Sequence, residues 1–190
     1  DSIMVGPGIG VDNEDWQKIE DYLIDLKGLL ILDADALNRI SEFKLGSNFF
    51  LERKFKTWIT PHGKEFLRLF PYVKSKTNVG LALKAAQEFN IGVLLKGANS
   101  VVADNDKAWQ LFGTDPRTAR AGLGDLLSGF VAGSSAIDLA YGRHMTTECF
   151  AQYVLFHSFA AYSCKRGSNA SAIGDELSKL IRNWKTRQIS

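Results

Sequence analysis

Short apolar runs alternate with helical patterns along most of the chain, and this alternation restricts the possible fold more than any other feature. The four clearest runs stand at residues 3–5, 29–32, 58–60 and 91–95. The run at 29–32 reads Leu-Leu-Ile-Leu without a polar break, which is typical of a strand buried on both faces of a parallel sheet. Strands that alternate with helices predict an α/β fold whose mostly parallel sheet is covered by helices.

The helices are expected where apolar residues recur at helical spacing. These patterns occupy residues 16–26, 36–40, 66–70, 78–90, 125–136, 144–165 and 170–184. Asp12 or Asn13 would cap the first of them. Turn residues bracket two further runs, at 101–103 and 109–112, and predict an antiparallel ribbon. The chain of 190 residues is long enough to bury a core, and we expect one domain over residues 1–190.

Composition narrows the class of protein. The net charge is +2, and no basic run is interleaved with aromatic residues, so we expect no nucleic-acid partner. No apolar run reaches membrane-spanning length and no signal peptide stands at the start, so we expect a cytoplasmic protein without a membrane partner. Cys149 and Cys164 lie in apolar helical patterns and are expected to be buried free thiols. No histidine is spaced for a metal site with a cysteine or an acid, and His157 is expected to be a core histidine.

Polar and glycine residues follow the first two expected strands directly. A Gly-Pro-Gly-Ile-Gly loop at residues 6–10 follows the first, and Asp33 and Asp35 follow the second. Ligands of open α/β sheets bind outside the carboxyl ends of the strands, where these residues would gather. The loop could equally be a tight turn. Asp33 is a candidate for acting through water on a metal or a ribose, whereas Asp35 is better explained as a helix cap.

Polar and charged residues also follow the third and fourth expected strands. His62 and Glu65 come after the third strand, three residues apart and therefore on one helix face. Lys96 comes after the fourth, beside a glycine, where it could meet a phosphate as a point charge. A structural histidine and a solvated surface lysine are the alternatives.

A Gly-Leu-Gly-Asp stretch at residues 122–125 leads into an apolar helical pattern that we expect to begin at Asp125. The free backbone N–H groups at a helix start, here those of Gly122, Leu123 and Gly124, form an anion site. One carboxylate at that site suits phosphoryl transfer, because it can accept a hydroxyl proton while the backbone neutralises charge. The alternative is that Asp125 only caps the helix.

Five segments taken together resemble one family. They are GPGIG (6–10), LDADAL (32–37), TPHGKEF (60–66), LLKGANSVVAD (94–104) and GLGD (122–125). In this order they are similar to the ADP- or ATP-dependent NAD(P)H-hydrate dehydratases of the ribokinase-like superfamily. The resemblance implies a ribokinase-like three-layer α/β/α sandwich. It also implies repair of hydrated NADH and NADPH, in which the added hydroxyl is phosphorylated from ADP or ATP with Mg²⁺ and phosphate is then eliminated.

The resemblance also implies roles for single residues. Asp125 matches the catalytic acid of the family, and Gly10 and His62 match positions that, with Asp125, contact the hydrate. The positions that match the nucleotide site are Lys96, Gly97, Ala98, Asn99, Ser100 and Gly124.

Two of the chain's departures from the family pattern affect the expected anion site and the expected fold. Arg117 and Arg120 stand where other members carry smaller residues, and they would either add anion contacts or point to solvent. The strands that normally precede residues 6–10 are missing, so we expect the chain to be the C-terminal portion of the full domain, with an exposed sheet edge that makes it unstable alone.

Further expectations from the resemblance are a homo-oligomer, a tetramer or larger, and a fused or separate NAD(P)H-hydrate epimerase. The alternatives are a small-molecule kinase of the same superfamily, acting on a vitamin precursor or sugar, and a nucleotide-binding relative without catalysis.

Overall fold

A six-stranded sheet forms the centre of the molecule. The computed structural model describes the chain except residues 11–15, 44, 113–120, 166 and 190, with side chains described through residue 183. The strands lie in chain order: β1 (Ser2–Val5), β2 (Leu29–Leu32), β3 (Thr57–Ile59), β4 (Gly92–Leu95), β5 (Val101–Ala103) and β6 (Ala108–Gln110). The first four are parallel and the last two pair antiparallel, which confirms the mostly parallel sheet and the ribbon.

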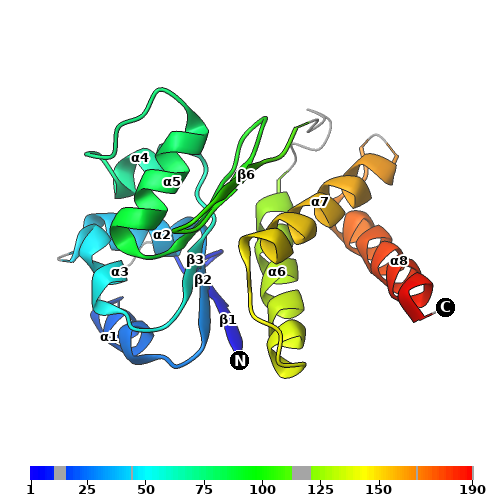
Figure 1. Cartoon of the computed structure of the whole chain (residues 1–190), viewed down its shortest axis with the longest axis horizontal. Helices are drawn as coiled ribbons and strands as arrows, with labels where there is room; N and C mark the ends of the chain where they lie inside the picture. The colour runs from blue at the N-terminus through cyan, green and yellow to red at the C-terminus, as the bar shows by residue number, and fades with distance from the viewer. Residues whose placement is uncertain (11–15, 44, 113–120, 166, 190) are drawn as a thin grey trace.

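Helices cover both faces of this sheet (Figure 1). The crossovers contain α1 (Trp16–Asp25), α2 (Ala34–Glu42), the short η1 (Gly46–Asn48) and α3 (Phe49–Glu52), α4 (Gly63–Leu69) and α5 (Asn78–Phe89). Strand order follows chain order, so right-handed crossovers place these helices on one face. The opposite face is covered by α6 (Leu123–Ala140) and α7 (Thr147–Ser163), and α8 (Ala170–Ile189) packs on α7. This is the predicted three-layer α/β/α arrangement.

The continuous apolar run of β2 is explained by the two faces. Leu30 and Leu32 point into the core under the crossover helices, whereas Ile31 points into the core under α6 and α7. On that second face Trp58 of β3 stacks on Phe150 of α7, with ring centroids 4.2 Å apart. Apolar side chains therefore bury both faces of these strands, and the polar side chains of interest lie at the strand ends.

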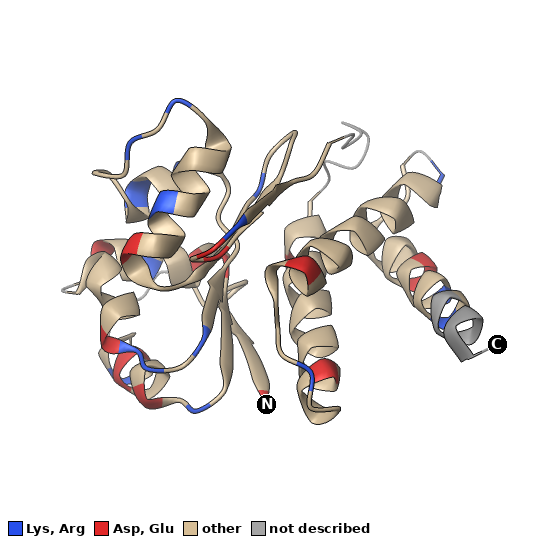
Figure 2. Cartoon of the chain, viewed as in Figure 1, with Lys and Arg blue, Asp and Glu red and all other residues tan. Residues whose placement is uncertain are grey.

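Helices α6 and α7 differ from the crossover helices in their charge. Figure 2 shows charged residues gathered on the crossover helices, whereas α6 and α7 bear few. Helix α7 packs against α6 and α8 through a small apolar cluster that contains Leu123 and Ala160. His157 of α7 is buried, as predicted, although its Nε2 has no partner in the described part of the chain. Cys149 and Cys164 are free but half-buried rather than buried, because each lies at one end of α7.

None of the helices in the described residues is long and apolar enough to cross a membrane.

Candidate active site

The carboxyl ends of the parallel strands meet at one edge, as the sequence predicts. Just beyond β3 and β4, His62 and Lys96 continue the parallel pairing as an isolated bridge. The Lys96 N–H donates to the Pro61 carbonyl at 2.8 Å. The ends of β3 and β4 are thereby held side by side, and the Lys96 side chain leaves from this edge.

Asp33, directly after β2, occupies the centre of this edge with only 1% of its surface exposed. Its Oδ1 accepts from the Ala34 N–H at 2.9 Å and from Lys96 Nζ at 2.7 Å. Its Oδ2 accepts from the Ser128 hydroxyl of α6. The carboxylate thus joins three elements, β2, β4 and α6, in one buried network.

Asp33 is also the N-cap of α2, and the prediction that Asp35 caps this helix is wrong. The helix begins at Ala34, immediately after the strand, so Asp35 already lies in its first turn. From there Asp35 Oδ2 accepts the Gly10 N–H at 3.1 Å. The Gly10 carbonyl accepts two N–H groups of Arg39, at 3.2 and 3.1 Å. The loop after β1 is therefore fastened to α2.

Helix α6 begins at Leu123, two residues earlier than predicted. Gly122 is its N-cap, with φ +79° and ψ −6°, a left-handed conformation that glycine adopts without steric cost. Its carbonyl accepts the first helical bond, from Leu126 N–H at 3.0 Å. The N–H groups of Leu123, Gly124 and Asp125 have no acceptor among the described residues, as an anion site requires.

Lys96 reaches this helix start. A Cβ built on Gly124 would lie 3.5 Å from Lys96 Nζ and 4.0 Å from Asp33 Oδ2. The ammonium group of Lys96 therefore lies against the first turn of α6, where glycine keeps the space open. The Lys96 ammonium group, held by Asp33, and a helix N-terminus converge at one point, which suits binding of an oxyanion such as phosphate.

Asp125 lies on the first turn of α6 and is exposed. It does not cap the helix, because Gly122 does, and no described residue is hydrogen-bonded to its carboxylate. The simple capping explanation for Asp125 is therefore wrong. What remains is an accessible carboxylate beside an anion site.

A family model described as NAD(P)H-hydrate dehydratase matches residues 1–182 of the chain. The chain belongs to this family. A bifunctional NAD(P)H-hydrate repair enzyme of Synechocystis is 35% identical over 133 residues, which are 70% of this chain and 25% of that protein. The corresponding enzyme of Methanopyrus kandleri is 27% identical over 96% of this chain and 36% of its own length. The chain thus spans about a quarter to a third of the curated relatives that it matches.

Solved structures show that the fold is ribokinase-like. A ribokinase-like superfamily protein of Enterococcus faecalis superposes with a TM-score of 0.77 and 22% identity, covering 96% of this chain and 63% of that one. An ADP/ATP-dependent NAD(P)H-hydrate dehydratase of Bacillus subtilis, crystallised with ATP and Mg²⁺, gives a TM-score of 0.70 at 23% identity, over 95% and 64% of the two chains.

The histidine that matches the dehydratase family's substrate position also holds a helix. His62 caps α4, and its Nδ1 accepts the N–H groups of Lys64 and Glu65 at 3.1 and 3.3 Å. Glu65 completes a capping box by accepting the His62 N–H at 2.7 Å. Because Nδ1 is an acceptor, this network assigns the ring proton to Nε2. His62 Nε2 lies 3.4 Å from Glu65 Oε1, and the His62 side chain is 51% exposed, so the ring holds the helix start while part of it stays accessible.

The segment that the resemblance predicts to bind nucleotide forms the loop between β4 and β5. Ser100 is buried. Its hydroxyl donates to the Gly97 carbonyl at 3.2 Å and accepts the Gly97 N–H at 3.3 Å, and these two hydrogen bonds close the loop. Gly97, Ala98 and Asn99 are exposed. This part of the loop therefore lies at the surface next to Lys96.

Two predictions fall on residues outside the described part. Neither the contacts of Arg117 and Arg120 nor the expected cap at Asp12 or Asn13 is described.

Sequence reasoning missed three residues of this edge. Ser128 is buried inside α6, where it donates to Asp33 and also bonds the Gly124 carbonyl at 3.0 Å. The Thr60 hydroxyl lies 3.4 Å from that of Ser128. Arg39 is 3% exposed. The available signal was a polar residue on the apolar face of each element, since buried polar groups are nearly always paired.

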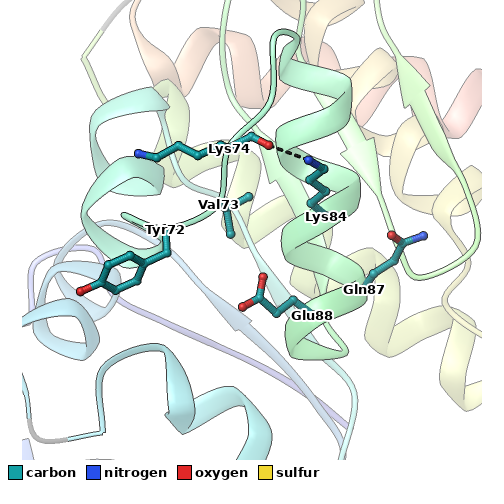
Figure 3. A pocket seen from close by; sticks show the side chains of 6 residues that line it. All are labelled: Tyr72, Val73, Lys74, Lys84, Gln87 and Glu88. Carbon is teal, nitrogen blue, oxygen red and sulfur yellow. Dashed lines mark hydrogen bonds between the residues drawn. The ribbon is translucent and has the colours of Figure 1, made fainter.

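A hollow of about 530 Å³ lies elsewhere, against α5. Figure 3 shows its lining, Tyr72, Val73, Lys74, Lys84, Gln87 and Glu88, with Lys84 Nζ donating to the Lys74 carbonyl at 2.7 Å. It shares no residue with the strand-end site, and both its ammonium groups bond carbonyls of the chain. It carries none of the chemistry described above.

Proposed function

We propose that the protein restores hydrated NADH and NADPH to NADH and NADPH, using ADP or ATP as phosphoryl donor. Membership of the dehydratase family supports this activity. The observation that carries it is the position of Lys96 Nζ, held by Asp33 against the first turn of α6 beside Gly124. A fixed cation, free helix N–H groups and an accessible carboxylate are what transfer of a phosphoryl group to a hydroxyl requires.

The nucleotide would bind at the β4–β5 loop, at Lys96, Gly97, Ala98, Asn99 and Ser100, and at Gly124. The transferring phosphate would lie at the backbone of Gly122, Leu123 and Gly124. Its charge would be neutralised by the α6 N–H groups and the Lys96 ammonium, which are already in place before the nucleotide arrives.

The residues present fit a Mg²⁺ ion that arrives with the nucleotide. No group of three or more His, Cys, Asp or Glu side chains in the described residues is placed to hold a metal. Mg²⁺ commonly keeps several waters and binds through substrate phosphates and one or two carboxylates. Asp125, in the first turn of α6, is an exposed carboxylate beside the proposed phosphate site. When bound, the ion would neutralise charge on the phosphates.

Asp125 would act as the proton acceptor. It takes the proton of the hydrate hydroxyl while that oxygen bonds to the terminal phosphorus of the nucleotide and the bond to the leaving phosphate breaks. A loose transition state needs only a weak, well-placed acceptor, so a carboxylate at a helix start suffices. The ring C–O bond to the new phosphate would then break, inorganic phosphate would leave, and the neighbouring ring carbon would lose a proton to water as the ring double bond of the reduced nicotinamide forms again. His62 and Gly10 would contact the hydrate.

The test uses the full-length protein with hydrated NADH, Mg²⁺ and either ADP or ATP. Recovery of the reduced nicotinamide absorbance with one nucleotide is the expected result, and it also identifies the donor. Asp125→Asn should bind nucleotide as the wild type does and turn over at least about a hundredfold more slowly, the usual effect of losing acid–base help. Asp175→Asn, an exposed carboxylate on α8, is the matched control. Normal turnover by Asp125→Asn would refute the base assignment.

If the wild type restores no reduced nicotinamide, its other behaviour would distinguish the two alternative functions. Nucleotide consumption with another small hydroxylated acceptor would favour a kinase. Nucleotide binding without any turnover would favour a relative that has lost catalysis.

Partners are part of the same proposal. The curated relatives are named bifunctional repair enzymes, which supports a second activity, an NAD(P)H-hydrate epimerase, in the same or a separate chain. A homo-oligomer and a cytoplasmic location remain predictions from the resemblance.

A further inference from the structure

Both polar atoms of the Gly10 peptide unit are fully used inside the protein. Its N–H donates to Asp35 Oδ2 at 3.1 Å, and its carbonyl accepts Nε and Nη2 of Arg39 at 3.2 and 3.1 Å. A backbone residue has one donor and a carbonyl with two lone pairs, so this clamp satisfies all three. Arg39 is 3% exposed, and both its bonds to Gly10 are charge-assisted and therefore strong.

The Cα face of Gly10 is open toward the described part of the chain. A Cβ built at this residue would have no atom of the described residues within 4 Å, and φ is +77°. A ligand that touches Gly10 therefore cannot hydrogen-bond to it without displacing Asp35 or Arg39. It can only pack on the Cα face, in the space that a side chain would fill.

We propose that Gly10 meets the substrate by packing alone, and that Asp35 and Arg39 are positioning residues that hold its Cα face in place. The inference rests on the proposed function, since it takes the hydrated nicotinamide ring as the ligand. The apolar face of that ring is the part that suits a surface without free donors or acceptors. Because residue 10 has no side chain, the ring can approach the backbone closely.

The first experiment compares Gly10→Ala with Gly8→Ala in the full-length protein. Gly8 has almost the same conformation, φ +74°, and the same open space, so both substitutions carry the same backbone strain. We expect Gly10→Ala to raise KM for hydrated NADH about tenfold or more and to leave nucleotide affinity within about twofold. Gly8→Ala should change neither value. Equal effects of the two substitutions would overturn the packing contact.

The second experiment tests the clamp. Arg39→Lys keeps the charge but loses the fork of two N–H groups, and Asp35→Ala loses the acceptor. Both should raise KM for the hydrate, and their effects should be less than additive because both act through Gly10. Arg68→Lys is the control, since Arg68 bonds Asn38 of the same helix α2 without contact to the loop. A merely structural role would lower the melting temperature and kcat and leave KM unchanged.

Hydrogen exchange of the Gly10 amide makes the clamp testable without turnover. Exchange should be faster in Arg39→Lys and Asp35→Ala than in the wild type and in Arg68→Lys. A wild type that binds nucleotide but restores no reduced nicotinamide would refute the proposed function, and the substrate contact with it. Equal exchange rates in all variants, or an unchanged KM in an active enzyme, would refute the clamp itself.

Discussion

Removal of the Lys96 ammonium should destabilise the protein and abolish nucleotide binding for two separable reasons. Lys96→Met leaves the carboxylate of Asp33, 1% exposed, without its cation. Breaking a buried ion pair from one side costs about 3–5 kcal/mol. The low end applies here, because Ser128 and the Ala34 N–H still donate to Asp33 and because Lys96 is 23% exposed. We therefore expect a loss of about 3 kcal/mol, or about 6–12 °C in Tm for a domain of this size.

The double variant Asp33→Asn/Lys96→Met should recover most of this stability. Asparagine is as good an N-cap as aspartate and still accepts a hydrogen bond from Ser128, but it brings no buried charge. Nucleotide binding should not recover, because the cation is still missing. Stability and ligand binding are thus expected to separate in this pair of variants.

The assay is urea unfolding at pH 7 followed by tryptophan fluorescence, with nucleotide binding measured by calorimetry on the same preparations. Lys107→Met is the control, because Lys107 pairs with Glu148 at 2.6 Å while both side chains are exposed, and such pairs contribute little. A Lys96→Met variant as stable as the wild type, or a double variant no more stable than Lys96→Met, would refute the reasoning.

Two further predictions concern pH. Burial lowers the pKa of His157 from 6.5 to about 4, so the unfolded chain takes up a proton at a higher pH than the folded one. The free energy of unfolding should therefore fall by up to about 3 kcal/mol between pH 7 and pH 4. In urea unfolding, His157→Gln should flatten this decline, whereas exposed His144→Gln should not. Burial and the neighbouring Asp21 raise the pKa of Glu20, whose two oxygens have no donor in the described residues, so its ionisation destabilises the fold as pH rises above about 4.5. Glu20→Gln should therefore gain more in melting temperature at pH 7 than at pH 4, with exposed Glu88→Gln as control; an equal change at both values would contradict this.

The edge at which the site forms could be predicted from sequence because strand direction decides it. Apolar runs followed at once by Asp33, His62 and Lys96 place those residues at one edge as soon as the strands are parallel. The alternation with helices predicts that the strands are parallel, whereas their order is given only by the structure. These inferences depend on local patterns, which a single sequence contains.

Individual tasks at that edge could not be predicted in the same way. Asp33 and Asp35 are both aspartates at a helix start, and only the exact turn into α2 decides which of them caps it. The start of α6 was misplaced by two residues because Gly122, rather than Asp125, ends the preceding turn. Ser128 was missed because its partner is 95 residues away in the chain.

The sequence by itself determined the layers, the parallel sheet and the edge that collects the polar residues, since hydrophobic periodicity and strand ends are local properties. Only the tertiary structure decided which groups meet there. The Asp33–Lys96 pair and the fastening of Gly10 by Asp35 and Arg39 join segments that are far apart in the chain. Such contacts are set by how the elements pack, because a buried charge or peptide group takes whichever partner the packing brings within hydrogen-bond distance.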